Sequence, residues 1–78
     1  MAMQKYRNLG GNSGVDSYEI GDGSITVRFT DGWAYLYTDA VTGAGDVRQM
    51  QALAERGAGL NSYISRVVKK RWADKWRG

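Results

Sequence analysis

The sequence contains no histidine, no cysteine and no proline. Without cysteine or histidine, the chain offers no disulfide, no zinc or iron–sulfur site of the usual kind, no thiol nucleophile and no imidazole base. Its acidic residues are dispersed, and no calcium-binding loop spacing occurs among them. We therefore expect a protein that is not an enzyme and that has neither a metal site nor a cofactor.

Long apolar runs are absent as well. The apolar stretches extend over only a few residues, so the sequence predicts no membrane span and no secretory signal. The lack of cysteine gives no reason to place the protein in an oxidising compartment. We expect it in the cytoplasm.

The chain has 78 residues, of which 42% are apolar and 24% charged, a mix typical of one small folded domain. A domain of this size buries only about 60% of its unfolded surface. The net charge of +3 is unevenly distributed. Residues 66–78 carry six Lys or Arg against one Asp, whereas residues 1–65 have a net charge of −2. A basic tail on a mildly acidic body indicates an anionic partner.

The first half of the chain predicts a β-meander. Residues 1–14 end in a run rich in Gly and Asn and are expected to form a flexible N-terminal arm. Three antiparallel strands follow over 15–21, 24–30 and 33–38, where apolar and polar residues alternate. Asp-Gly pairs at 22–23 and 31–32 separate the strands, and Asp-Gly between alternating runs is a strong hairpin signal.

Two-residue turns at both Asp-Gly pairs would set the register. Tyr18 would then lie opposite Val27, and Val27 opposite Leu36. The opposite, mostly polar face would hold three aromatic residues and an arginine opposite one of them: Trp33, Tyr35, Tyr37 and Arg28.

Beyond Gly45 the apolar period becomes helical. Asp46 and Gln49 have the spacing of a capping box, and the first helix is expected to end at the Gly57-Ala58-Gly59 sequence. The apolar stripe of the second helix ends at about Trp72. We expect this helix to continue as a basic C-terminal helix (66–78) whose last turn projects beyond the body. The fold class is therefore α+β, a three-stranded antiparallel meander with two helices packed on one face, and residues 15–78 form one domain.

The order of these residues resembles the KTSC domain, a family named for the C-terminal domain of some lysyl-tRNA synthetases. The resemblance covers roughly residues 13–68 and rests on Ser13-x-Val15, Tyr18-x-Ile20, Phe29, Gly32, Tyr35-Leu36-Tyr37 and Gly57-x-Gly59-Leu60-Asn61-x-x-Ile64. Members of the family often have a Val-Pro step after Tyr-x-Tyr, whereas this chain continues with Thr38-Asp39-Ala40-Val41. RNA binding has been suggested for the family from its synthetase context, and the resemblance implies no more than that.

The first candidate site is the aromatic face. Bases stack on aromatic side chains displayed on a sheet, and Arg28 beside Trp33, Tyr35 and Tyr37 would add a phosphate contact. The alternative is that the rings pack under a helix or a partner, since aromatic residues favour strands and a small domain needs every large side chain for its core. We favour this alternative for Tyr35 and Tyr37 and expect Trp33 to be exposed.

The second candidate site is the basic tail. A helix that interleaves cations with aromatic rings can bind a phosphate backbone. The residues concerned are Arg66, Lys69, Lys70, Arg71, Trp72, Lys75, Trp76 and Arg77. Such a helix can also bind a membrane surface or a protein groove, or it can be a solvated last turn whose cations suit the helix dipole.

The sequence thus favours a non-enzymatic nucleic-acid-binding module that binds RNA or single strands, and the family resemblance favours RNA over DNA. A protein-interaction module, such as a phage-type inhibitor or a homodimer, is the alternative. Binding of a small nucleotide between one of the Gly loops, 43–45 or 57–59, and the aromatic face is a third hypothesis, although capping and turn chemistry explain both loops.

Overall fold

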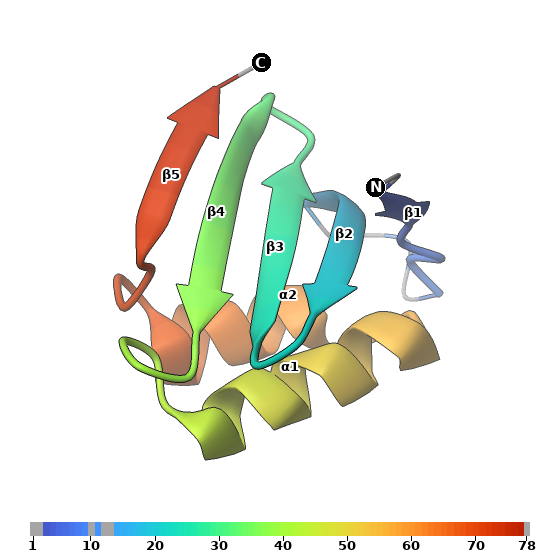
Figure 1. Cartoon of the computed structure of the whole chain (residues 1–78). Helices are drawn as coiled ribbons and strands as arrows, with labels where there is room; N and C mark the ends of the chain where they lie inside the picture. The colour runs from blue at the N-terminus through green and yellow to red at the C-terminus, as the bar shows by residue number, and fades with distance from the viewer. Residues whose placement is uncertain (1–2, 10, 12–13, 78) are drawn as a thin grey trace.

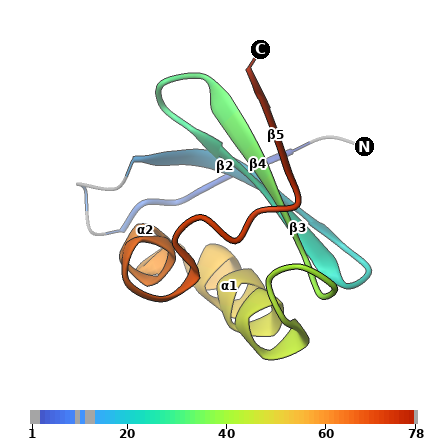
Figure 2. The same ribbon diagram turned by 90° about the vertical axis from the view of Figure 1, so that its left-hand side faces the viewer.

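The computed structural model describes residues 3–9, 11 and 14–77, and these form an antiparallel sheet of five strands with helices on one side. The elements are β1 (Gln4–Lys5), β2 (Val15–Gly21), β3 (Ser24–Phe29), β4 (Trp33–Thr38), α1 (Ala44–Arg56), α2 (Leu60–Tyr63), a π-helical turn η1 (Ile64–Val68) and β5 (Asp74–Arg77). The strands lie side by side in chain order (Figure 1). Both helices lie on the same side of the sheet (Figure 2). The α+β class and the antiparallel meander, here β2–β3–β4, are confirmed, and two further strands extend the sheet.

The first hairpin has the predicted register. Tyr18 lies opposite Val27 and Ile20 opposite Ile25, with Asp22-Gly23 as a two-residue turn. Gly23 has a φ of 68°, a conformation that glycine adopts without the clash of a Cβ atom.

The predicted register of the second hairpin is wrong by one residue. Arg28 lies opposite Ala34 and Val27 opposite Tyr35. The turn is one residue longer than predicted: the amide of Gly32 donates to the carbonyl of Phe29, and Gly32 has a φ of 93°. This is the geometry of a three-residue hairpin loop with a left-handed third residue. Because side chains alternate across a strand, the shift moves Tyr35 and Tyr37 from the predicted polar face to the face that carries the helices.

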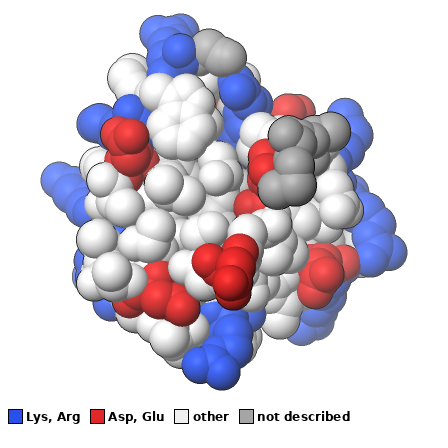
Figure 3. All heavy atoms as spheres, viewed as in Figure 1, with Lys and Arg blue, Asp and Glu red and all other residues white. Residues whose placement is uncertain are grey.

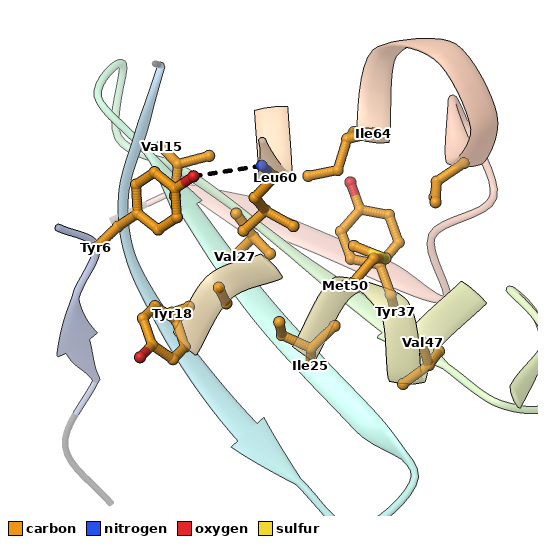
Figure 4. Close-up of a cluster of buried hydrophobic side chains, with 12 residues drawn as sticks. Tyr6, Val15, Tyr18, Ile25, Val27, Tyr37, Val47, Met50, Leu60 and Ile64 are labelled. Carbon is orange, nitrogen blue, oxygen red and sulfur yellow. Dashed lines mark hydrogen bonds between the residues drawn. The ribbon is translucent and has the colours of Figure 1, made fainter. Parts of the chain in front are cut away.

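The core lies between the sheet and the helices (Figure 4). Its sheet side consists mainly of Ile25, Val27 and Tyr37, none of which is more than 1% exposed. The helices contribute most of the stripe predicted from the period of 3.6 residues, namely Val47, Met50, Ala54, Leu60, Ile64 and Val68. Of the other predicted members, Leu53 is only partly buried, Val67 is 43% exposed, and Trp72 lies beyond the end of the helix. Each fully buried aliphatic side chain of this kind stabilises the fold by about 1.5–3 kcal/mol.

Residues 4–9 are part of the domain, so the prediction of a flexible arm over 1–14 is wrong for this segment. β1 pairs with β2, and Tyr6 is only 2% exposed. The amide of Leu60 donates to the Tyr6 hydroxyl over 3.3 Å, and the amide of Leu9 donates to the Gly57 carbonyl over 2.8 Å. One buried aromatic ring thus anchors a segment with too few apolar residues to show a period. The prediction rested on the Gly-rich run at residues 10–14, and residues 10, 12 and 13 of this run lie outside the described residues.

The prediction of a C-terminal helix over 66–78 is wrong from Lys69 onwards. The helix ends at Val68, and β5 pairs antiparallel with β4, placing Tyr35 opposite Lys75 and Ala34 opposite Trp76. A projecting helical turn would have left the backbone N–H and C=O groups at the outer edge of β4 without protein partners. Pairing with β5 gives these groups backbone hydrogen bonds. Residue 78 lies outside the described part of the chain.

Within the described residues, no helix is long and apolar enough to cross a membrane.

Candidate functional site

An aromatic hollow lies on the helix side of the sheet, near the β3–β4 turn. Figure 1 shows that β3 and β4 extend beyond the helices toward this turn. Its volume is about 220 Å³. Three elements build it: the β3–β4 hairpin, the π-helical turn η1 and the segment between η1 and β5. The residues that line it are Phe29, Asp31, Tyr35, Tyr37, Ile64, Lys69 and Trp72. We call these seven residues the aromatic hollow.

Tyr35 is the centre of the rings in the hollow. Its ring centroid lies 4.8 Å from that of Trp72, with the planes tilted by 57°. The Phe29 ring meets it edge-on at 5.4 Å, and the Tyr37 ring stacks at 6.5 Å. Offset and edge-to-face pairs of this kind add about 0.5–1.5 kcal/mol each beyond the area they bury. The rings therefore form a pre-organised apolar platform, and the side chains of Tyr35 and Trp72 remain partly exposed.

Lysine and arginine side chains surround this platform. The Lys75 ammonium lies 5.5 Å from the ring centroid of Trp33 and 5.1 Å from that of Trp72. Trp33 shares the helix-side face with Tyr35, two residues away on β4, and Arg77 is opposite Trp33 in the register. Lys69 lines the hollow itself, and Asp31 is the one acidic residue among the described residues that line it. With Lys69, Lys75 and Arg77 against Asp31, the site has a net charge of +2.

Lys69 has an unfavourable backbone conformation. Its φ of 54° and ψ of −119° are sparsely populated by residues other than glycine, at a cost of about 1–3 kcal/mol. The conformation follows a π-helical turn, in which the amide of Lys69 donates to the carbonyl of Ile64 over 2.6 Å. Strained residues and π-helical turns both occur frequently at functional sites. Here they direct the chain away from the helix so that Trp72 reaches Tyr35.

Arg71, predicted to contact a phosphate, instead anchors this segment to α1. Its guanidinium forms an ion pair with Asp46 at 2.7 Å and donates to the carbonyls of Thr42, at 2.8 Å, and Val67, at 3.1 Å. In return, the Thr42 hydroxyl donates to the Arg71 carbonyl over 2.6 Å. These contacts hold the residue that precedes Trp72, so Arg71 acts as a positioning residue.

The Asp46 carboxylate shows why the predicted capping box is wrong. No side chain caps α1; the N-cap is Gly43. The Tyr63 hydroxyl donates to Asp46 over 2.6 Å, and this bond, followed by that from Arg71, lowers the pKa of the Asp46 carboxyl below its ordinary value. The same bond raises the pKa of Tyr63. Asp46 thus links α1, α2 and the segment before β5 instead of capping its own helix.

Tyr37 belongs to the core and is only 1% exposed, as the packing alternative for this residue anticipates. Burial raises its pKa far above the ordinary value of 10.0, and the neighbouring Tyr35 adds to the shift. Tyr37 is therefore the floor of the hollow and not a stacking surface.

Arg28 and Trp76 lie on the other face of the sheet, which is covered by no helix of the described residues. The register places Lys5, Ser17, Arg28, Ala34 and Trp76 in one row across the five strands. Trp76 is 41% exposed. Viewed from this side, uncharged residues occupy much of the centre of the surface, basic side chains lie mostly at its margin, and acidic side chains lie mainly inside that margin (Figure 3). The predicted cluster of Arg28 with Trp33, Tyr35 and Tyr37 does not form, because the register shift separates Arg28 from the aromatic residues.

Arg66 and Lys70 lie outside the aromatic hollow, and both are exposed. Arg66 lines a separate groove of about 320 Å³ between α1 and η1, together with Leu53, Tyr63 and Val67. Six predicted residues (Trp33, Tyr35, Tyr37, Lys69, Trp72 and Lys75) therefore meet at or beside the aromatic hollow, with Tyr37 as its buried floor and Arg77 next to it. The other predicted residues lie at the anchor (Arg71), in the groove (Arg66), on the uncovered face (Arg28, Trp76) or exposed elsewhere (Lys70).

Three residues of the hollow, Phe29, Asp31 and Ile64, were not predicted as site residues from the sequence. Phe29 and Ile64 carry core-type signals, and Asp31 belongs to the Asp-Gly turn signal. The three-residue loop places Phe29 and Tyr35 on one face, but Gly32 would be left-handed in a two-residue turn as well, so the sequence carries no separate signal for this placement.

Within the described residues, no group of three or more His, Cys, Asp or Glu side chains could hold a metal ion. Comparisons with protein-family models, with curated proteins and with solved structures find no match to this chain. The resemblance to the KTSC domain thus stays a prediction.

Proposed function

We propose that this protein is a non-enzymatic nucleic-acid-binding module that takes single-stranded RNA or DNA at the aromatic hollow. The observation that carries the proposal is the placement of partly exposed Tyr35, Trp72 and Trp33 rings among Lys69, Lys75 and Arg77. Bases stack on such rings with about 1–3 kcal/mol per base, and basic side chains beside them bind the connecting phosphates. The resemblance to a synthetase-associated family favours RNA over DNA.

The size of the hollow supports a base rather than a duplex. Its volume of about 220 Å³ lies below the ~300–1,000 Å³ of pockets that enclose drug-sized ligands. A base that is unstacked from its neighbours can enter such a space, whereas a base inside a helix cannot. We expect micromolar affinity with weak dependence on the bases outside the hollow.

The Lys75 side chain would change its position when a base binds. In the free protein its ammonium lies over the Trp33 and Trp72 rings, an interaction worth about 0.5–1 kcal/mol at an exposed site. A base that stacks on Trp72 takes the place of the ammonium, and the displaced ammonium is then free to pair with a phosphate.

Fluorescence anisotropy with a labelled oligouridine of about a dozen nucleotides, titrated at several salt concentrations, tests the proposal. With about three phosphate contacts, the logarithm of the affinity should fall with the logarithm of salt concentration with a slope of about −2. Lys75→Gln should weaken binding and reduce the slope by about 0.7. Arg48→Gln is the matched control, because Arg48 is an exposed cation on α1 that lines a different pocket beside the β2–β3 turn. No binding at low salt, or equal effects of the two substitutions, would contradict the proposal.

A protein partner is the second candidate, and the uncovered face favours it. Trp76 is exposed on that face, and β5 is an edge strand with one neighbour in the described sheet. Binding of this kind would depend on Trp76 and little on salt. Sedimentation of the protein alone, compared with Trp76→Ala, detects self-association through this face.

A further inference from the structure

Asp31 is an acidic residue in a site whose other charges attract anions. It lines the aromatic hollow beside Tyr35, Lys69 and Trp72. A carboxylate at a phosphate-binding surface weakens binding through charge repulsion unless it forms a compensating contact with the ligand. The position of Asp31 therefore indicates that the ligand presents a hydrogen-bond donor to this carboxylate.

The turn explains one oxygen of this carboxylate. Asp31 Oδ1 accepts a hydrogen bond from the Trp33 amide over 3.0 Å, which closes the turn that precedes β4. The residue is exposed, and within the described part of the chain it forms no ion pair with a lysine or arginine. An ionised carboxyl accepts at about four sites, and among the described residues only the Trp33 amide donates to Asp31. The carboxylate can therefore accept further hydrogen bonds from a ligand.

We propose that Asp31 selects guanine as the base that enters the aromatic hollow, an inference that rests on the proposed function. A carboxylate only accepts hydrogen bonds. Guanine is the base whose pairing edge presents two adjacent donors, N1–H and the 2-amino group. Adenine and cytosine each present an amino group beside a ring-nitrogen acceptor, and uracil presents one N–H between two carbonyls. Because those acceptors repel a carboxylate, guanine alone makes a bidentate contact with it.

The arrangement of the hollow suits this contact. The Phe29, Tyr35 and Trp72 rings offer stacking to any base, since every base has a π-face, so they cannot select one by themselves. Selection needs a polar group at the edge of the stacked base, and Asp31 is the acidic residue among those that line the hollow. Lys69 and Lys75 then contact the phosphates on either side.

The test compares labelled oligonucleotides of equal length that are uridine except at the central position. The central guanosine oligonucleotide should bind about 5–10-fold more tightly than those with adenosine, cytidine or uridine, the lower part of the range for a bidentate side-chain contact to a base. Inosine lacks the 2-amino group and should fall between guanosine and adenosine.

Asp31→Asn is the diagnostic variant, because its amide oxygen can still accept from the Trp33 amide and keep the turn. The guanosine preference should disappear in this variant, while binding of the all-uridine oligonucleotide stays equal or becomes slightly tighter as a negative charge is removed. Thermal melting of both proteins verifies that the fold is retained.

The other outcomes separate this inference from the proposed function. If the wild-type protein binds all the oligonucleotides equally, the role of Asp31 is overturned and the proposed function stands. If the preference persists in Asp31→Asn, guanine selection by Asp31 is likewise overturned. If no oligonucleotide binds, the proposed function fails and this inference fails with it. Guanosine 5′-monophosphate that binds as tightly as the oligonucleotide would overturn the proposal of a strand and show that the site takes a free nucleotide.

Discussion

One face of strand β4 contains two regions with different surroundings. Tyr37, at the end of the strand near α1, is 1% exposed and packs against the helices. Tyr35 and Trp33, which follow on the same face in the opposite direction, are only partly buried. The residue types are alike and the backbone is continuous. The two regions differ in the side chains that pack over them. Apolar side chains of the helices pack over Tyr37, whereas Trp72, Lys69 and Lys75 lie around Tyr35.

This contrast shows how a domain of 78 residues can hold both a core and a binding site on one strand. The helix ends at Val68, so the helical cover of the sheet ends there as well. The chain then crosses the uncovered part of the face as an irregular segment, anchored by Arg71, before it pairs as β5. The π-helical turn and the strained Lys69 are the local cost of that crossing.

Tyr37→Ala should cause the greatest change, a loss of stability. Removing a fully buried aromatic ring costs about 3–5 kcal/mol, a large part of the total stability of a domain this small. Urea denaturation followed by tryptophan fluorescence measures it. Tyr35→Ala should cost clearly less, and equal losses at the two positions would abolish the distinction between core and hollow.

The stability that depends on Tyr37 should also be lost at high pH. Folding raises the pKa of Tyr37 above its ordinary value of 10.0, so the folded state favours the protonated phenol. The resulting stability is fully present below about pH 10 and is lost progressively as the pH rises above it. Melting temperatures measured from about pH 8 to about pH 11 should fall less in Tyr37→Phe than in the wild-type protein. An identical decline in both proteins would show that folding does not raise the pKa of Tyr37.

Trp72→Ala should weaken binding of single-stranded RNA by about tenfold, in line with the loss of one stacking partner. Anisotropy titration with the labelled oligouridine measures this loss. Melting of the variant verifies that the domain still folds without the contact between Trp72 and Tyr35.

Trp76→Ala is the matched control for this substitution, because it removes the same type of side chain from the uncovered face of the sheet. Trp76 lies opposite Ala34, on the side away from the hollow, and its removal should change the affinity by less than about twofold. A loss comparable to that of Trp72→Ala would place the nucleic acid on the uncovered face and reverse the assignment of the two faces.

Lys69→Gly should have small and opposite effects on stability and on binding. Glycine adopts a φ of 54° without strain, so the variant should gain about 1 kcal/mol of stability. It also removes a cation from the hollow, and RNA binding should weaken by a few-fold. Urea denaturation and the anisotropy titration measure the two effects. A variant that is more stable and binds equally well would show that the strained lysine has no part in the site.

The local features of the fold could be predicted because each has a short-range cause. Asp22-Gly23 specifies a two-residue turn by itself, and the spacing of Val47 and Met50, and of Leu60 and Ile64, marks the buried face of the helices. The second turn could not be predicted in the same way. Asp31-Gly32 is compatible with a two-residue or a three-residue loop, and that single residue decides which face the aromatic residues occupy.

The fold class, the first hairpin, the helical stripe and the residue types of the site follow from the amino-acid sequence alone, because they depend on periods and turn residues within a few positions of one another. Only the tertiary structure showed that Tyr6 joins the core and that the basic tail pairs with β4. The same is true of Arg71, which anchors the segment before β5 to α1, and of Lys75, whose ammonium lies over the Trp33 and Trp72 rings. The physical reason is that each of these outcomes depends on a surface left open elsewhere in the molecule. The free edge of β4 and the uncovered rings of Tyr35 and Trp33 exist only after the sheet and helices have packed.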